Sequence, residues 1–130
     1  MSQSYDNCFA CGTANPIGLK LNFSYEAGQA LAQLQIPKLY EGYPEVIHGG
    51  IIATLLDEAM AKAVLHSGTT AFTAKLTTSY RHPLPALLPI TIKGWITEAK
   101  TRTIRTAALI TDAQGTIYAS AEAVFVVPKG

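Results

Sequence analysis

One segment of this chain has helical periodicity, whereas the segments around it alternate or turn. From residue 48 to residue 66, apolar side chains recur every three or four positions, which places them on one face of an α-helix. A stripe of this kind is typical of a helix that packs against a sheet. Its expected members are Ile52, Leu56, Ala59, Met60 and Ala63, with Leu55 at the edge.

Six other segments alternate apolar and polar residues, as half-buried strands do. Two precede the helix and four follow it. They are residues 19–25, 30–36, 71–82, 90–98, 102–112 and 116–127. Short turns between successive strands favour an antiparallel sheet curled around the helix. We therefore predict one α+β domain over residues 1–130, with residues 1–18 as an N-terminal segment that covers apolar surface.

The composition excludes several classes of protein. Hydrophobic residues make up 48% of the chain and charged residues only 15%, so we expect a large core and a surface partly covered by a partner subunit. A net charge of +1 argues against a protein that binds nucleic acid through bulk charge. Because there is no run of 18 apolar residues and no signal peptide, we expect no membrane contact and a cytoplasmic location.

The start of the helix offers groups for chemistry. Gly49 and Gly50 follow His48 where the first backbone N–H groups of a helix have no partner within the helix. Asp57 lies on a flank of small residues, while Glu58 points about 100° away and is interpreted as a surface charge. A solvated carboxylate is the ordinary interpretation of such an Asp. Amide donors and a carboxylate are nevertheless the groups required for attack on an acyl carbon.

Cys8 and Cys11 form a Cys-x-x-Cys pair, which is half of a zinc site or a redox pair. A zinc site of the usual kind needs four ligands, and neither a second Cys pair nor a close His pair follows in the sequence. A redox pair of the thioredoxin kind starts a helix, and no helix is expected here. We therefore predict no metal, and we interpret this region as part of the covering segment.

The order of strands and helix, with His48-Gly49-Gly50 at the helix start and Asp57 nine residues after the His, resembles the hotdog-fold acyl-CoA thioesterases. The likeness is greatest to the phenylacetyl-CoA and small human-type branch. Residues 8–19 (Cys-Phe-x-Cys-Gly-x-x-Asn-Pro-x-Gly-Leu) are similar to the N-terminal segment of many bacterial members. The resemblance implies a hotdog fold, in which a curved antiparallel sheet of about six strands wraps one long central helix.

The resemblance also implies roles for individual residues. The Gly49 N–H would polarise the thioester carbonyl, and Asp57 would act as general base or as nucleophile. Thr73 would help to hold the attacking water. His48 is a further catalytic candidate, although a purely structural role at the helix start is equally open.

Substrate binding is implied for Gly50. It is also implied for Arg81 and His82, at the end of the first strand after the helix, which would contact the phosphates of CoA. No metal and no cofactor are implied. The expected partners are acyl-CoA and further copies of the chain, as a homodimer or a dimer of dimers (homotetramer). Gly49 of one subunit would then face Asp57 of its neighbour.

One departure from the family pattern concerns Gly42, where relatives place an Asn or Gln seven residues before the first Gly. Glu41, Tyr43 or His48 would have to replace that amide. This favours, as an alternative, an acyl-CoA-binding protein with little or no catalysis. A hotdog hydratase or dehydratase ranks last, because neither His48 nor His66 has an acid at a suitable spacing. The sequence leaves open the acyl chain and the choice between anhydride formation and direct attack by water.

Overall fold

The computed structural model describes residues 7–129, so residues 1–6 of the expected covering segment lie outside the described residues. Residues 7–129 form one long helix and six strands, as expected. The elements are β1 (Ser24–Glu26), β2 (Gln29–Leu34), the short 3-10 helix η1 (Lys38–Tyr40), α1 (Gly49–His66), β3 (Phe72–Tyr80), β4 (Ile90–Ala99), β5 (Thr103–Thr111) and β6 (Ile117–Val126).

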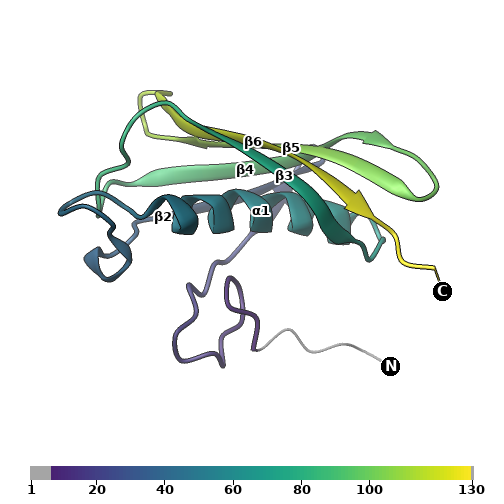
Figure 1. Cartoon of the computed structure of the whole chain (residues 1–130), viewed down its shortest axis with the longest axis horizontal. Helices are drawn as coiled ribbons and strands as arrows, with labels where there is room; N and C mark the ends of the chain where they lie inside the picture. Colours follow the sequence, from purple (N-terminus) through teal and green to yellow (C-terminus); the bar gives the residue numbers. More distant parts are fainter. Residues whose placement is uncertain (1–6, 130) are drawn as a thin grey trace.

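The six strands form one antiparallel sheet in the order β1-β2-β4-β5-β6-β3. The sheet curves over α1, which lies along one of its faces (Figure 1). This is the hotdog fold that the resemblance implied. Although β3 directly follows the helix, it pairs with the last strand, β6, and so forms one edge of the sheet.

The core lies between α1 and the sheet. All six residues of the predicted apolar stripe are buried, and Val64, next to Ala63, is buried with them. Gly94 of β4 allows the helix to come close, because a Cβ atom there would lie 2.4 Å from the backbone carbonyl carbon and oxygen of Ala59. A side chain at position 94 would therefore separate helix and sheet.

The first strand is shorter than predicted. Residues 19–25 were expected to be extended, but β1 contains only Ser24–Glu26. Lys20 has a φ of 54°, which interrupts an extended chain. The N–H groups of Leu19 and Leu21 donate to the carbonyl oxygens of Phe9 and Ala10 at 2.8 Å. The alternation of residues 19–23 thus reflects burial of their apolar side chains against the core, while the backbone bonds with the N-terminal segment rather than with β2.

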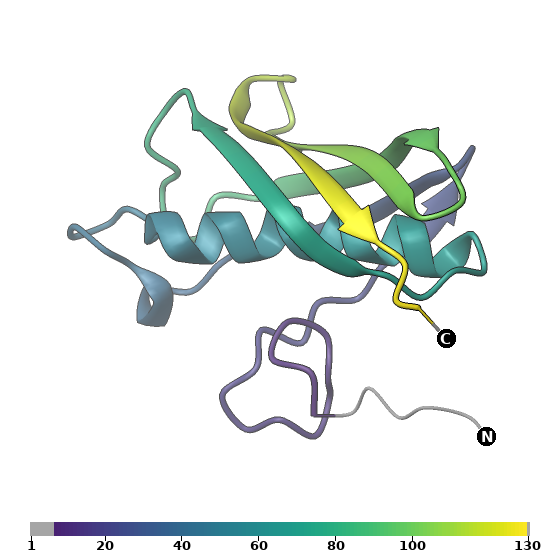
Figure 2. The same ribbon diagram turned by 45° about the vertical axis from the view of Figure 1, so that its right-hand side comes forward.

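The N-terminal segment, residues 7–20, lies on the side of α1 opposite the sheet (Figure 2). Ala10 is buried in the core cluster, and Cys8 and Leu19 pack against that cluster. Within residues 7–129, no helix is long and apolar enough to cross a membrane.

The β5–β6 hairpin is closed by the carboxylate of Asp112. The backbone N–H groups of Gln114 and Thr116 each donate to it at 3.0 Å, and the Tyr118 hydroxyl donates at 3.1 Å. Desolvation alone would raise the pKa of Asp112, but these hydrogen bonds stabilise the charged form and lower the pKa below its ordinary value of 3.8.

Candidate active site

The start of α1 is capped by His48. Its Nδ1 accepts from the Gly50 N–H at 2.9 Å, and its carbonyl oxygen accepts from the N–H groups of Ile51 and Ile52 at 3.0 and 3.1 Å. Within the described part of the chain, the Gly49 N–H has no acceptor. The two predicted glycine amide donors therefore differ in whether they are already hydrogen-bonded. His48 already binds the Gly50 donor, and Gly49 is the donor that remains for a ligand.

Tyr80 fixes the position of this helix start. Its hydroxyl donates to the Gly49 carbonyl oxygen at 2.7 Å, which links the end of β3 to the first turn of α1. Tyr80 was not among the site residues predicted from the sequence. Its place near the end of a predicted strand could have suggested a role. The sequence does not show, however, that the end of this strand lies beside the first turn of the helix.

The structure brings Asp57 and Thr73 together, a contact that the sequence did not predict. The Thr73 hydroxyl donates to Asp57 Oδ1 at 2.8 Å, the Asp57 side chain is half-buried and Thr73 is exposed. A carboxylate held by one hydroxyl keeps lone pairs available to accept a proton or to attack a carbonyl carbon. The pair is therefore suitable for either of the two mechanisms that the sequence left open.

A β-bulge brings Thr73 to the helix side of the sheet. Strict alternation would place Thr73 on the same face as Lys75, away from α1. The register shifts between these two residues, so that Thr73 pairs with the buried Phe125 and Lys75 pairs with Val124. Cross-strand partners share a face of the sheet. The extra residue of the bulge thus turns the Thr73 hydroxyl toward Asp57.

The two central groups of the candidate site do not meet within one chain. Gly49 and Asp57 are eight residues apart on the same straight helix, so their backbones are about 12 Å apart along its axis. One thioester carbonyl cannot contact both. Either only Gly49 or only Asp57 acts on the substrate, or one subunit supplies Gly49 and a second subunit supplies Asp57.

The edge strand β3 lies beside these groups and is largely exposed. Of its nine residues only Thr78 is half-buried, and the other eight are exposed. The apolar side chains of Phe72, Leu76 and Tyr80 are 65%, 36% and 51% exposed. Apolar groups on a sheet edge with unpaired backbone groups are a typical site for strand pairing with another chain.

Arg81 and His82 follow β3 directly, and both side chains are exposed. Their backbone N–H groups donate to the Tyr118 carbonyl oxygen at 2.9 and 3.3 Å. The His82 ring contacts the Tyr118 ring edge-on, with 6.0 Å between centroids. The structure thus places both predicted phosphate contacts at the same end of β3 as Tyr80 and the start of α1.

Gly42 packs directly against the helix cap. A Cβ atom at this position would lie 3.3 Å from the Cα of His48, which is tighter than ordinary contact. Of the predicted replacements for the missing amide, Glu41 accepts the Glu45 N–H at 2.7 Å, and Tyr43 is 85% exposed. His48 is thus the side chain nearest to this position.

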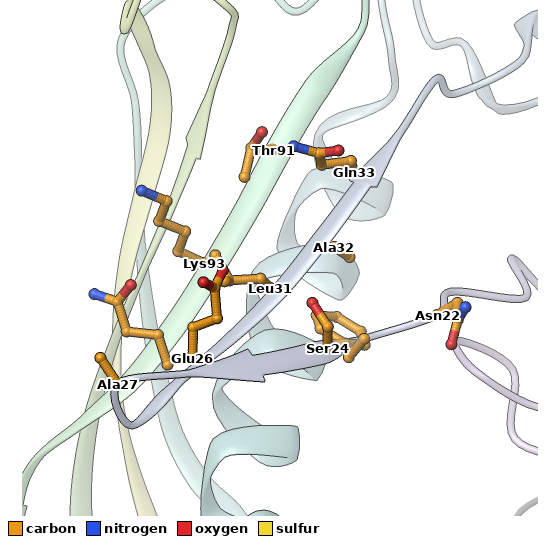
Figure 3. Close-up of a pocket in the computed structure, with 11 residues that line it drawn as sticks. Asn22, Ser24, Glu26, Ala27, Leu31, Ala32, Gln33, Thr91 and Lys93 are labelled. Carbon is orange, nitrogen blue, oxygen red and sulfur yellow. The ribbon is translucent and has the colours of Figure 1, made fainter.

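A large cavity of the described part of the chain lies elsewhere. It has a volume of about 750 Å³ and is formed by β1, β2, β4 and the residues before β1 (Figure 3). Glu26 and Lys93 are the charged residues among those that line it. None of its lining residues belongs to α1 or β3, which carry the groups described above. We therefore place the candidate site by its chemistry rather than by cavity size.

A second group of reactive side chains surrounds Cys8 and Cys11. The Cys8 thiol lies 3.5 Å from Glu58 Oε2, so Glu58 is not the free surface charge that the sequence suggested. Burial, the hydrogen bond with Cys8 and the charge of Glu58 raise the pKa of Cys11 to about 12. A thiol with so high a pKa is not a nucleophile near neutral pH.

Comparison with known proteins assigns the chain to a family. Residues 45–119, which include α1, β3 and the loop after it, match the family described as the thioesterase superfamily. The chain belongs to this superfamily. Among curated proteins it is similar to the acyl-coenzyme A thioesterase THEM4 of Mus musculus, with 29% identity over 87 residues. These residues are 66% of this chain but only 37% of the mouse protein.

Solved structures show the same fold. The crystal structure of another thioesterase superfamily protein matches with a TM-score of 0.85 and 30% identity, over 90% of this chain and 61% of that one. The protein smu.793 of Streptococcus mutans, whose structure contains acetyl CoA, matches with a TM-score of 0.75 and 23% identity. That match covers 83% of this chain and 90% of the other. This chain therefore spans less than two thirds of the mouse protein and of the superfamily protein with the TM-score of 0.85.

Proposed function

We propose that the protein hydrolyses the thioester bond of acyl-CoA. The observation that carries the proposal is the Asp57 carboxylate, which Thr73 holds at 2.8 Å on the central helix of a thioesterase-superfamily fold. Two further observations support it. The Gly49 N–H is available at the positive end of the helix dipole, and similar proteins include an acyl-coenzyme A thioesterase and a protein that binds acetyl CoA.

In the proposed reaction, the Gly49 N–H donates to the thioester oxygen as negative charge develops there. Asp57 either removes a proton from the attacking water or attacks the carbonyl carbon itself to form an anhydride, which water then hydrolyses. In both cases the carbon–sulfur bond breaks, and CoA leaves as the thiol. Thr73 orients the carboxylate and, through it, the attacking group.

We further propose that the site is shared between two copies of the chain. The separation of about 12 Å between Gly49 and Asp57 along one helix supports this arrangement, because it prevents both from reaching one carbonyl. The exposed, apolar edge strand β3 is the proposed contact, since pairing it with a second β3 would extend the sheet and bury Phe72 and Leu76. A dimer and a dimer of such dimers both satisfy this proposal.

CoA is proposed to bind along the end of β3. Arg81 and His82 are exposed there and can reach phosphate oxygens, for which a guanidinium group has a suitable geometry. The helix start with the Gly49 amide lies at the same end of β3, because Tyr80 links the two. The thioester would thus follow the phosphates toward α1.

The test is release of free CoA from a panel of acyl-CoAs, followed with a thiol reagent. The wild-type protein should release CoA from at least one member. Asp57→Asn should lower kcat by at least about 100-fold, because the amide can neither accept the proton nor form an anhydride. The matched control is Glu122→Gln, which neutralises an exposed carboxylate on β6. Normal turnover by folded Asp57→Asn would overturn the assignment of Asp57.

A binding protein without catalysis is the second candidate function, and the close contact of Gly42 with His48 favours it. An Asn or Gln at position 42 would require His48 to shift by a few tenths of an ångström. Calorimetry with the same acyl-CoA panel distinguishes the two functions. Tight binding with no thiol release would select the binding protein, whereas turnover would exclude it.

A further inference from the structure

The N-terminal segment and α1 bring three metal-binding groups together. Cys8, Cys11 and Glu58 each offer a ligand atom, and the three atoms lie within 4.8 Å of one another. All three side chains are half-buried. The Glu58 carboxylate comes from the helix, some 50 residues away in the sequence, so spacing along the chain could not reveal it.

The separation of the Cys8 and Glu58 ligand atoms fits a tetrahedral zinc ion. With Zn–S bonds of about 2.3 Å and Zn–O bonds of about 2.0 Å, sulfur and oxygen ligands are about 3.5 Å apart and two sulfurs are about 3.8 Å apart. The distance from Cys8 Sγ to Glu58 Oε2 is 3.5 Å. The Cys11 N–H also donates to Cys8 Sγ at 3.4 Å, which favours a negatively charged sulfur at that position.

The local charges also suit a divalent cation. Two thiolates and one carboxylate carry three negative charges, and zinc would leave a net charge of −1. Lys62, one turn after Glu58 on α1, lines the same cavity as Cys11 and would balance that charge. Paired thiolate ligands favour zinc over magnesium or calcium, which take oxygen ligands.

We propose that Cys8, Cys11 and Glu58 bind one zinc ion, with water in the fourth position. The three groups line a cavity of about 260 Å³ together with Lys62, Thr69 and Phe72, so a water molecule has access. The ion would fix the N-terminal segment to the face of α1 opposite the sheet (Figure 2). Its role is structural, because the carboxylate of Glu58 points about 100° around the helix from that of Asp57.

A redox pair explains the cluster less well. A reactive Cys-x-x-Cys pair keeps one thiol as a thiolate, near a helix N-terminus or a positive charge. Here the carboxylate of Glu58 lies 3.5 Å from the Cys8 sulfur and opposes a free thiolate. A simple hydrogen bond from the Cys8 thiol to Glu58, with no metal, is the alternative that the experiment must exclude.

The experiment measures metal bound to the reduced, untagged full-length protein. After incubation with zinc and gel filtration, elemental analysis should find one zinc ion per chain. Cobalt should give the sulfur-to-metal charge-transfer band and the strong visible bands of a tetrahedral site. Zinc should also raise the Tm of the wild-type protein, since it binds only the folded state.

Three variants test the ligand set. Cys8→Ser and Glu58→Gln should each weaken zinc binding at least about tenfold in competition with a chromogenic chelator. Asp57→Asn is the matched control, because it removes the neighbouring carboxylate and should leave binding unchanged. Circular dichroism establishes that each variant is folded. The proposal is overturned if the wild-type protein retains no zinc, or if Glu58→Gln binds zinc as tightly as the wild type. Neither result depends on thioesterase activity.

Discussion

Replacement of Gly94 by alanine tests the packing that positions the candidate site. The new Cβ atom would lie 2.4 Å from the carbonyl carbon and oxygen of Ala59 and 2.8 Å from the Met60 nitrogen. These are backbone atoms and cannot rotate away. To restore an ordinary contact of 3.4 Å, α1 and β4 must separate locally by about 1 Å.

The cost follows from the contacts that such a gap weakens. A separation of this size forfeits a quarter to a half of the dispersion energy of each contact across it. Overpacking of a core typically costs 1–3 kcal/mol, and we take about 3 because backbone meets backbone. Alanine is otherwise favoured over glycine in a strand by roughly 0.5–1 kcal/mol. We therefore expect Gly94→Ala to lower the free energy of unfolding by about 2 kcal/mol and the Tm by about 7 °C.

Thermal and urea unfolding at one fixed protein concentration measure this loss. Gly49→Ala is the matched control, because the nearest atom to its Cβ would be the Tyr80 hydroxyl oxygen at 3.7 Å. It should leave the Tm unchanged or raise it. Since Asp57 is two residues before Ala59, Gly94→Ala should also lower turnover. If Gly94→Ala unfolds at the wild-type temperature, the close approach of helix and sheet is not as described.

Two further predictions concern single hydrogen-bonding groups. Thr73→Val should lower kcat for acyl-CoA at least about tenfold, because it removes a hydrogen bond to the charged Asp57. Thr73→Ser keeps a hydroxyl and should retain most of the activity. Equal rates for both variants would exclude the proposed role of the hydroxyl. Asp112→Asn should destabilise the protein at neutral pH, and the difference from wild type should shrink as the pH falls below 3.8. The reason is that a lowered pKa stabilises the fold only while the carboxylate is charged. Urea midpoints at several pH values measure this, and a difference that grows on acidification would contradict it.

The fold was predictable because its signals are local. The helical period of residues 48–66 and the alternation of the later strands follow directly from which face each element buries. The same rule failed at residues 19–23, where the backbone N–H groups of Leu19 and Leu21 donate to residues 9 and 10 and Lys20 takes a positive φ. Alternation reports burial on one side, and it does not identify the partner that covers that side.

The site was only partly predictable, because its geometry depends on features that spacing does not carry. The bulge after Thr73 inverted the face expected from alternation, and a single unpaired residue leaves no mark in the sequence pattern. The Tyr80 bond to Gly49 and the contact of Cys8 with Glu58 join residues far apart in the chain. Gly49 and Asp57 were selected as candidates from the helix start and the flank of small residues, and the resemblance then implied their roles.

The shared site can be tested by mixing two inactive variants. Asp57→Asn removes the carboxylate. Gly49→Pro removes the backbone donor. The fold should tolerate this change because proline suits the first position of a helix. The residue before it, His48, already has the extended φ and ψ of −58° and 135° that a following proline requires. Each variant alone should be inactive.

Denatured together in equal amounts and refolded, the two variants should recover about one quarter of wild-type activity, because half of the dimers are mixed and each mixed dimer has one intact site. Wild-type protein taken through the same procedure supplies the reference. If the mixture stays inactive while mass spectrometry shows mixed dimers, then Gly49 and Asp57 do not meet across subunits, and the proposed site is wrong.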